Sequence, residues 1–275
     1  MSEIVSKTTL LARLQQLPSL PVIVQELIAS FSNSELDTAV LAQKIEQDLG
    51  LSARVLRVAN SSFYGLSRKV GSVQDALVVL GFECVRSMAL SAGMLQAFPI
   101  ASGSSFDRPA YWQRSFRVAI IAKALAKELR WRQELAFTAA LFHDIGLLVL
   151  DLCIPQQFSA LLSQAESAEN LLAIEQAELG FNHVEMGGEL VRLWNFPAEI
   201  EQVVRHWREP ELPADPLAGI VYIAVLLEGG VSVEALMASL PMDLVSRMNL
   251  TVSRIAGCLP TSDQLDAAAS LVQAG

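Results

Sequence analysis

The hydrophobic positions of the chain recur mostly with the spacing of an α-helix. Between residues 51 and 59, for example, Leu51, Val55 and Val58 fall on one helical face. The same spacing predicts helices over residues 20–31, 37–45, 51–59, 82–98, 107–129, 133–143, 156–166, 168–179, 183–194, 197–207 and 216–228, and less clearly in the tail from Ser232. Residues 147–152 resemble a strand but lack a hairpin partner, so we expect helix or turn there. The pattern predicts an all-α protein.

Local signals place helix ends and divide the chain. Ser72 to Asp75 matches a capping box, so a helix should start there and end at Gly81. The small, polar stretch over residues 99–105 is the best internal boundary. Asp107 and Pro109 provide the acidic cap and early proline that open a long helix. We therefore expect an N-terminal helical lobe over residues 1–98, a second helical lobe over 107–230 and a C-terminal helical extension over 231–275.

Composition narrows the classes of function. Of the 275 residues, 52% are hydrophobic and the mean hydropathy is +0.39, so burial should be extensive. Acidic residues outnumber basic ones by 29 to 20, and the net charge of −9 repels phosphate backbones. The chain also has no run rich in lysine or arginine. We therefore expect no nucleic-acid partner.

Three further features indicate a cytoplasmic protein without membrane contact. The three cysteines form no CxxC pair, which favours buried thiols in a reducing compartment. The N-terminus has no basic segment followed by an apolar one, unlike a signal peptide. The most apolar stretch, residues 139–154, carries His143, Asp144 and Asp151, which suits a protein core better than a bilayer.

Candidate chemistry rests on three histidines, His143, His183 and His206. Asp144 follows His143 at the end of an apolar helix, where an imidazole and a carboxylate can reach one divalent ion such as zinc, iron, manganese or nickel. Taken singly, each histidine is more often a core or surface residue, and a bare His-Asp pair often occurs by chance. Gly187-Gly188 most simply permits close helix packing, because no phosphate-loop pattern is present.

The context of the His-Asp pair is more specific. In order, the chain contains WQRSFRVAIIAKALA, AALFHDIGLLVL, GFNHVEMGGELVRLWNFP and VVRHW, which resemble successive helices of the HD superfamily of phosphohydrolases. Upstream, LPSLPVIVQEL, IEQDLGLSARVLRVANSSFYG and GSVQDALVVLGFECVRSMAL resemble the N-terminal lobe of HDOD proteins, the HD-related output domains of bacterial signalling. The resemblance covers about residues 17–207, and it implies an HD-like helical bundle behind an N-terminal lobe.

The resemblance also implies a site that has lost part of its metal ligands. Active HD enzymes hold a metal through a histidine, the His-Asp pair and a later aspartate. The pair is His143-Asp144 here, but Arg114 stands at the position of the first histidine and Val225 at that of the last aspartate. A second set, His183 and His206, matches positions that serve another metal or the substrate phosphate in some HD enzymes. A metal, if bound, would use His143, Asp144, His183 and His206.

Arg114 is the more informative of the two replacements. A guanidinium is permanently positive and cannot coordinate a metal. Its helical spacing from Val118 and Ile121 points it inward, so we expect it to pair with Asp144 in the place of the metal. The alternative is that Arg114 extends toward solvent at the helix start. Glu228 could replace the carboxylate missing at Val225 only if its helix rotated or shifted.

These expectations favour a noncatalytic regulatory module that acts through protein or ligand binding, without a cofactor. The cleft between the lobes, or a surface beside the old active site, would receive the partner. The family resemblance suggests bacterial signalling partners, such as response-regulator receivers or cyclic di-GMP proteins, and the apolar composition suggests a homodimer. The alternative is a metal-dependent phosphohydrolase that acts on a nucleotide or phosphoester with a divalent transition metal.

Overall fold

The computed structural model describes residues 6–16, 20–31, 38–61, 64–98, 103–209 and 216–270, and every regular element in these ranges is an α-helix. This confirms the predicted fold class. Asp37, the first residue of the helix predicted over residues 37–45, and residues 99–102 of the predicted lobe boundary lie outside the described residues. The helices are α1 Lys7–Gln15, α2 Val22–Ala29, α3 Thr38–Gln47, α4 Leu49–Ala59, α5 Val73–Leu80, α6 Phe82–Ala97, α7 Arg108–Glu128, α8 Gln133–Leu141, α9 Gly146–Cys153, α10 Pro155–Gln164, α11 Ala168–Leu179, α12 His183–Leu193, α13 Ala198–His206, α14 Pro216–Glu228, α15 Val233–Ser239, α16 Met242–Met248, α17 Val252–Cys258 and α18 Ser262–Ser270.

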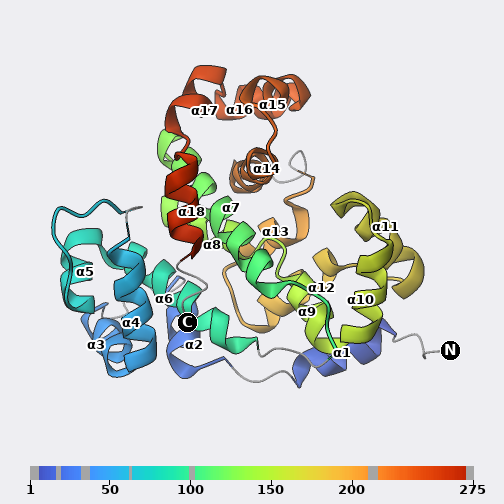
Figure 1. Cartoon of the computed structure of the whole chain (residues 1–275), viewed down its shortest axis with the longest axis horizontal. Helices are drawn as coiled ribbons and strands as arrows, with labels where there is room; N and C mark the ends of the chain where they lie inside the picture. Colours follow the sequence, from blue (N-terminus) through green and yellow to red (C-terminus); the bar gives the residue numbers. More distant parts are fainter. Residues whose placement is uncertain are drawn as a thin grey trace.

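The N-terminal lobe is built around α6. Helices α2, α4 and α5 pack against it, and α3 lies on α4 and α5 at the left of Figure 1. Ser72 starts α5 as predicted, because its hydroxyl accepts a hydrogen bond from the Asp75 amide at 2.9 Å. Helix α1 instead contacts α9 and α12 of the second lobe, and Arg13 donates to the Cys153 carbonyl at 2.7 Å. The first helix therefore ties the chain start to the second lobe.

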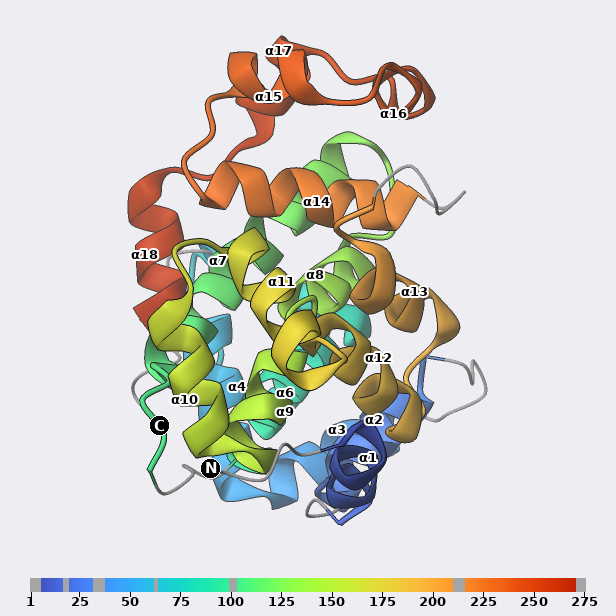
Figure 2. The same cartoon turned by 90° about the vertical axis from the view of Figure 1, so that its right-hand side faces the viewer.

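The second lobe is centred on the long helix α7. It packs along α8, and α14 crosses both of them (Figure 2). Asp107 caps α7 by accepting from the Ala110 amide at 2.9 Å. Arg108, the first residue of α7, forms a buried ion pair with Asp151 of α9 and donates to the Phe98 carbonyl at 3.0 Å. Ser104 donates to the same Asp151 carboxylate, so one buried carboxylate fastens the chain that enters α7.

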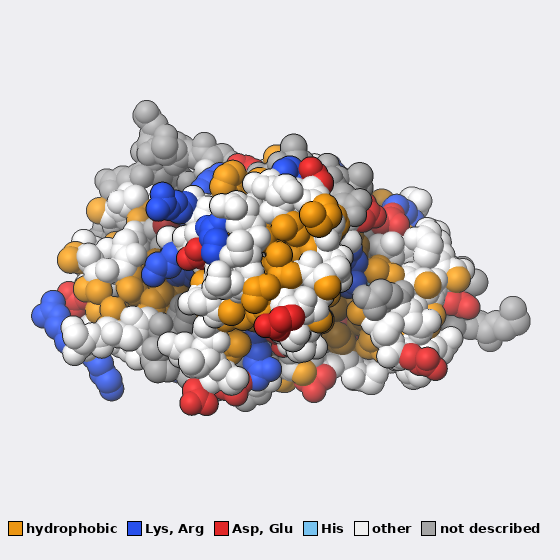
Figure 3. Space-filling view, turned by 90° about the horizontal axis from the view of Figure 1, so that it is seen from above, with side chains coloured by type: hydrophobic (Ala, Val, Ile, Leu, Met, Phe, Trp, Pro, Cys, Tyr) orange, Lys and Arg blue, Asp and Glu red, His pale blue; other side chains and the backbone are white. Residues whose placement is uncertain are grey.

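The C-terminal helices form a separate layer. Helices α15 and α16 contact α14, and α17 contacts α15 and α7, whereas α18 returns along α7 (Figures 1 and 2). Seen from this side, hydrophobic side chains gather in a band across the middle of the surface, with charged groups around it (Figure 3). Met242 of α16 and Val252 of α17 are exposed apolar residues of this layer.

The predicted helix over residues 133–143 ends early, at Leu141, and a turn over residues 142–145 leads into α9. The reason lies at Gly146, where a Cβ would sit 1.7 Å from the carbonyl oxygen of His183 and 2.8 Å from the amide nitrogen of Gly187. The backbones of α9 and α12 can approach this closely only without a side chain there. The bend therefore brings the turn after α8 to the start of α12.

The apolar segment Gln133–Cys153 is long enough to cross a membrane by composition, and it is the one such segment found in the described ranges. However, 89% of its most apolar window is buried inside the protein. It therefore serves as core, as its charged residues led us to expect.

Replacing Gly146 with alanine should be strongly destabilising, because the new methyl group would meet backbone atoms that cannot move aside. We expect a loss of about 3 kcal/mol or more in the free energy of unfolding, measured by urea denaturation. The matched control is Gly257→Ala in α17, where an added Cβ meets nothing within 4 Å. That change should alter stability by less than about 1 kcal/mol. Equal effects of the two changes would contradict the close-approach argument.

Candidate functional site

The His-Asp pair lies in the turn between α8 and α9, and it is buried. His143 is fully enclosed and Asp144 is 3% exposed. His183, the first residue of α12, is equally enclosed and faces the same turn, because α12 approaches α9 at Gly146. The Asn182 side chain fixes this helix start by accepting from the Glu185 amide at 3.0 Å. Two predicted histidines and the aspartate therefore meet in the core.

The two imidazoles both direct Nε2 at the carboxylate of Asp144. His143 Nε2 lies 3.4 Å from Asp144 Oδ2, and His183 Nε2 lies 3.8 Å from Asp144 Oδ1. Neither nitrogen has a hydrogen-bond partner among the described residues, and neither does Asp144 Oδ1. The centre of the site therefore holds polar atoms whose hydrogen-bonding capacity is unused.

The opposite edge of each imidazole is held by an acceptor. His143 Nδ1 lies 2.5 Å from the Ala140 carbonyl oxygen, and a carbonyl only accepts, so Nδ1 carries the proton. His183 Nδ1 lies 2.7 Å from Glu175 Oε2, which also accepts from the His183 backbone amide at 2.8 Å. Both rings are thus oriented from behind, in the way that outer groups orient metal-binding histidines.

Two arginines approach the same carboxylate. Arg114 Nη1 lies 3.8 Å from Asp144 Oδ2, and Arg208 Nη2 lies 3.7 Å from Asp144 Oδ1. The expected approach of Arg114 to Asp144 is therefore present as an ion pair, but its hydrogen bond goes to Glu228, with Nε 3.2 Å from Oε2. The side chain of Arg114 is 40% exposed, so it reaches inward at one end and solvent at the other.

The donors present do not fit a divalent ion. Two imidazole nitrogens and a carboxylate are suitable ligands by type, and both rings are held from behind. However, Val225 is a buried hydrocarbon at the position of the fourth ligand, and guanidinium groups approach both carboxylate oxygens. No group of three or more histidines, cysteines or acidic residues in the described ranges has an arrangement that could hold a metal.

His206 does not join this group. It ends α13, its side chain is 37% exposed, and its ring lies 3.8 Å from Glu209. The buried face of α13 carries Val203 and Trp207, and His206, one residue before Trp207, is rotated away from it. Of the ligand set that the metal-binding alternative would use, His206 therefore lies apart from His143, Asp144 and His183.

The two residues that follow His206, Trp207 and Arg208, lie beside the site. Trp207 packs its ring edge-on against His143, with the centroids 5.0 Å apart. Arg208 lies over the Trp207 ring at 4.2 Å and reaches Asp144. The segment that contains His206 therefore reaches the site through Trp207 and Arg208.

Other residues of the site were not found from the sequence. Glu175, fully buried in α11, orients His183, and Glu228 of α14 holds Arg114. Tyr111 of α7 is also buried, and burial, followed by the charge of Asp144, raises its pKa. Only Glu228 gave a sequence signal, one turn beyond Val225, and it serves as the partner of Arg114.

Burial and charge set the protonation of the His-Asp pair. Burial lowers the pKa of His143 below its ordinary value, and the opposing charge of Asp144 does not overcome this. Burial alone would raise the pKa of Asp144, but its electrostatic interactions with the two imidazoles and with Arg208 and Arg114 hold that pKa below its ordinary value. Asp144 is therefore an anion, and His143 is neutral with an unprotonated Nε2.

Comparison with known proteins is consistent with this geometry. The family model of the HDOD domain matches residues 17–210. The chain belongs to the HDOD family. Its fold matches a crystal structure from Shewanella amazonensis, provisionally described as a phosphohydrolase, at 25% identity and a TM-score of 0.78, covering 98% of this chain and 100% of that one. An HDOD domain protein of unknown function from Geobacter sulfurreducens matches at 21% identity and a TM-score of 0.71, with 97% of each chain covered.

A further relative is longer than this chain. An uncharacterized protein of Treponema pallidum is 24% identical over 264 residues, which cover 92% of this chain and 50% of that protein. The chain thus spans about half the length of this relative. A shorter match of 61 residues at 36% identity, 22% of this chain and 15% of the other, links it to the uncharacterized protein YuxH of Bacillus subtilis. The descriptions of these two relatives name no reaction.

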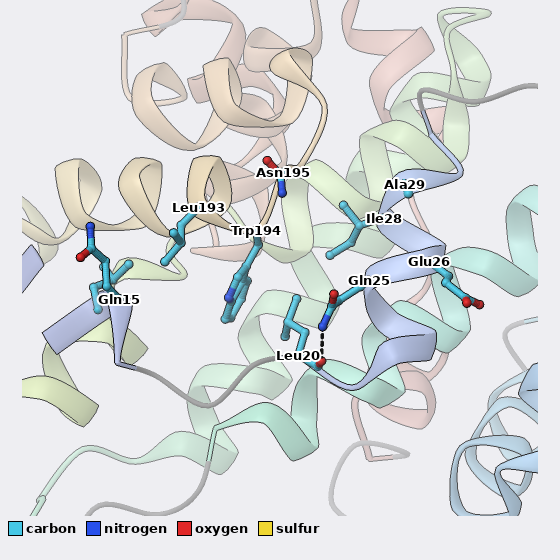
Figure 4. Close-up of a pocket in the computed structure, with 10 residues that line it drawn as sticks. Gln15, Leu20, Gln25, Glu26, Ile28, Ala29, Leu193, Trp194 and Asn195 are labelled. Carbon is cyan, nitrogen blue, oxygen red and sulfur yellow. Dashed lines mark hydrogen bonds between the residues drawn. The ribbon is translucent and has the colours of Figure 1, made fainter. Parts of the chain in front are cut away.

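The HDOD fold also forms a pocket where α1 and α2 face the end of α12. Its volume is about 550 Å³, and Trp194 lies between Leu193 and Gln15 on one side and Leu20 and Gln25 on the other (Figure 4). Its described lining has amides and one carboxylate but no lysine or arginine. This cavity between the lobes is chemically unlike the arginine-flanked site at Asp144.

The lowered pKa of His143 predicts a specific pH dependence of stability. The unfolded chain takes up a proton at His143 near pH 6.5, whereas the folded chain does so only at lower pH. The stabilising contribution is therefore complete above pH 6.5 and declines below it, by up to about 1.4 kcal/mol per pH unit. His143→Asn keeps a donor for the Ala140 carbonyl but removes this titration.

Urea denaturation of both proteins between pH 7.5 and 5 measures the effect. The wild-type protein should lose free energy of unfolding more steeply than His143→Asn as the pH falls, so the gap between the two should narrow. Parallel pH profiles would show that His143 titrates equally in the folded and unfolded chains.

Proposed function

We propose that this HDOD chain is a noncatalytic signal-transduction module that acts by binding other proteins. The observation that carries the proposal is the pair of guanidinium groups on Asp144, one near each carboxylate oxygen. The charge that a catalytic metal would supply to this carboxylate is already provided by the protein. The site is a charge-balanced part of the core.

The electrostatic argument can be given a magnitude. Two unit charges 4 Å apart interact by about 4 kcal/mol at an effective dielectric constant of 20, and a divalent ion doubles this for each arginine. An ion beside Asp144 would meet that repulsion from Arg114 and Arg208. It would also lack the carboxylate that Val225 replaces. The repulsion by the two arginines and the absence of a carboxylate at Val225 both weaken metal binding.

A phosphohydrolase is the second candidate, and one observation favours it. Three buried polar atoms lie close together and have no hydrogen-bond partner among the described residues. They are His143 Nε2, His183 Nε2 and Asp144 Oδ1. A divalent ion would satisfy all three if Arg114 and Arg208 swung outward. The Shewanella structure provisionally described as a phosphohydrolase adds to this alternative.

The nature of the partner belongs to the same proposal. A similar structure from Marinobacter aquaeolei, with 24% identity and a TM-score of 0.75, covers 97% of this chain and 61% of that one, and is provisionally described as a signal transduction protein. We propose bacterial signalling proteins as partners, among them receivers and cyclic di-GMP proteins. A cytoplasmic location stays a prediction.

Metal content separates the two candidates. We expect the purified chain to contain less than about 0.1 equivalent of transition metal by mass spectrometry, and to show no metal-dependent hydrolysis of bis-p-nitrophenyl phosphate. Arg114→His combined with Val225→Asp restores both missing ligand types and should bind close to one equivalent of Mn²⁺ or Zn²⁺.

The matched control is Arg114→Gln with Val225→Asn, which removes the same side chains without adding an imidazole or a carboxylate. It should bind metal much more weakly than the restored variant. A stoichiometric ion in the wild-type protein, with turnover that disappears in His143→Ala, would overturn the noncatalytic proposal.

A further inference from the structure

The helix α18 packs along α7 and lines a groove together with α7 and α14. It lies along α7, beyond the residues that the HDOD family model matches, and runs from the C-terminal layer toward the junction of the lobes (Figure 1). Leu265 is its half-buried apolar contact. Asp266, the next residue, forms an ion pair with Arg117 of α7. Among the side chains of α18 that the structure describes, Leu265 thus supplies an apolar contact and Asp266 an ion pair.

Cavities lie on both sides of α18. One, of about 320 Å³, is lined by Arg117 and Ile121 of α7, Leu227 and Glu228 of α14, and Leu265 and Asp266 of α18 itself. Another, of about 650 Å³, lies between α7 and the segment that leads into α18, with Tyr64, Lys123 and Pro260 in its lining. These two spaces open at the surface, so the parts of α18 and its leading segment that line them lack van der Waals contacts that they make where they pack on α7.

The docking of α18 is weak for two further reasons. A helix of this length is only marginally stable on its own, so its order depends on the groove. Its ion pair with Arg117 joins two partly exposed side chains, and such pairs contribute little and are screened by salt. The helix should therefore open locally well below the free energy of global unfolding.

We propose that the groove between α7 and α14 is a docking site for an amphipathic helix of a partner protein, and that α18 is its occupant within the chain. The partner helix carries an apolar residue followed directly by an acidic one, as Leu265 and Asp266 do. This is the helix-in-groove mode of recognition, with an apolar anchor and one charge that sets the register. The inference rests on the proposed partner-binding function and names its surface.

The groove is electrostatically continuous with the buried site. Arg117, which holds Asp266, also lies 3.8 Å from Glu228, the residue that accepts the hydrogen bond of Arg114. Arg114 in turn contacts Asp144. Release of Asp266 from Arg117 would leave Arg117 beside Glu228, the residue that also holds the arginine next to the His-Asp pair.

The first experiment measures hydrogen exchange of the full chain. Amides of α18 should exchange at least about 100-fold faster than those of α7, and faster still at 1 M than at 0.05 M NaCl. Protection of α18 equal to that of α7, and independent of salt, would overturn the proposal, because the groove would then be permanently filled.

The second experiment tests the groove with a probe. A fluorescein-labelled peptide with the sequence of residues 261–270 is titrated into full-length Leu265→Asp, whose own helix should leave the groove. The control is Met242→Asp, which adds the same carboxylate at an exposed apolar position of α16. The peptide should bind Leu265→Asp at least about tenfold more tightly than Met242→Asp or the wild-type chain.

The peptide itself carries the specificity test. An Asp266→Lys version should lose binding to Leu265→Asp, because it would place a cation against Arg117. Equal binding of the two peptides, or none to Leu265→Asp when hydrogen exchange shows α18 released, overturns the groove proposal. A metal bound in the wild-type site would instead contradict the noncatalytic function. The hydrogen-exchange and peptide-binding results would still test the groove independently.

Discussion

A buried negative charge is the constraint on which this structure depends. Asp144 lies in the core at a helix junction, where an uncompensated carboxylate would be costly. Two arginines from different segments compensate this charge, one on α7 and one after α13. Two oriented imidazoles also face the carboxylate. Helices far apart in the sequence are therefore held around one carboxylate. Arg114, one of the two replacements that resemblance identifies as a lost ligand, supplies part of this compensation.

The sequence was a good guide wherever a local rule applies. Helical spacing predicted the all-α class, Ser72 and Asp107 predicted caps that the structure contains, and Gly187 was expected to permit close packing, which it does against Gly146. The same rules missed the end of α8. The apolar pattern continues through residues 142–145, whereas the turn is required by the approach of α12, which is a tertiary contact.

In the candidate site, too, the sequence identified some residues and missed those whose roles depend on tertiary packing. Resemblance located His143, Asp144 and His183, which the fold brings together, and Arg114, which approaches them. It could not distinguish His206 from its neighbours, since one residue in a helix changes the direction of a side chain by about 100°. Glu175 and Arg208 were missed because nothing in their local sequence distinguishes them from solvated charges. Their roles exist only after α11 and the end of α13 are packed.

The buried pair of Arg108 and Asp151 has a mechanical consequence. Through it the carbonyl at the end of α6, the hydroxyl of Ser104 and the first turn of α7 are all fastened to α9. A junction anchored on both sides transmits a displacement and does not absorb it by bending. A displacement of the N-terminal lobe should therefore be transmitted to α9 in the second lobe without bending of this junction. Such stiffness suits a protein that transmits a signal through a change in conformation.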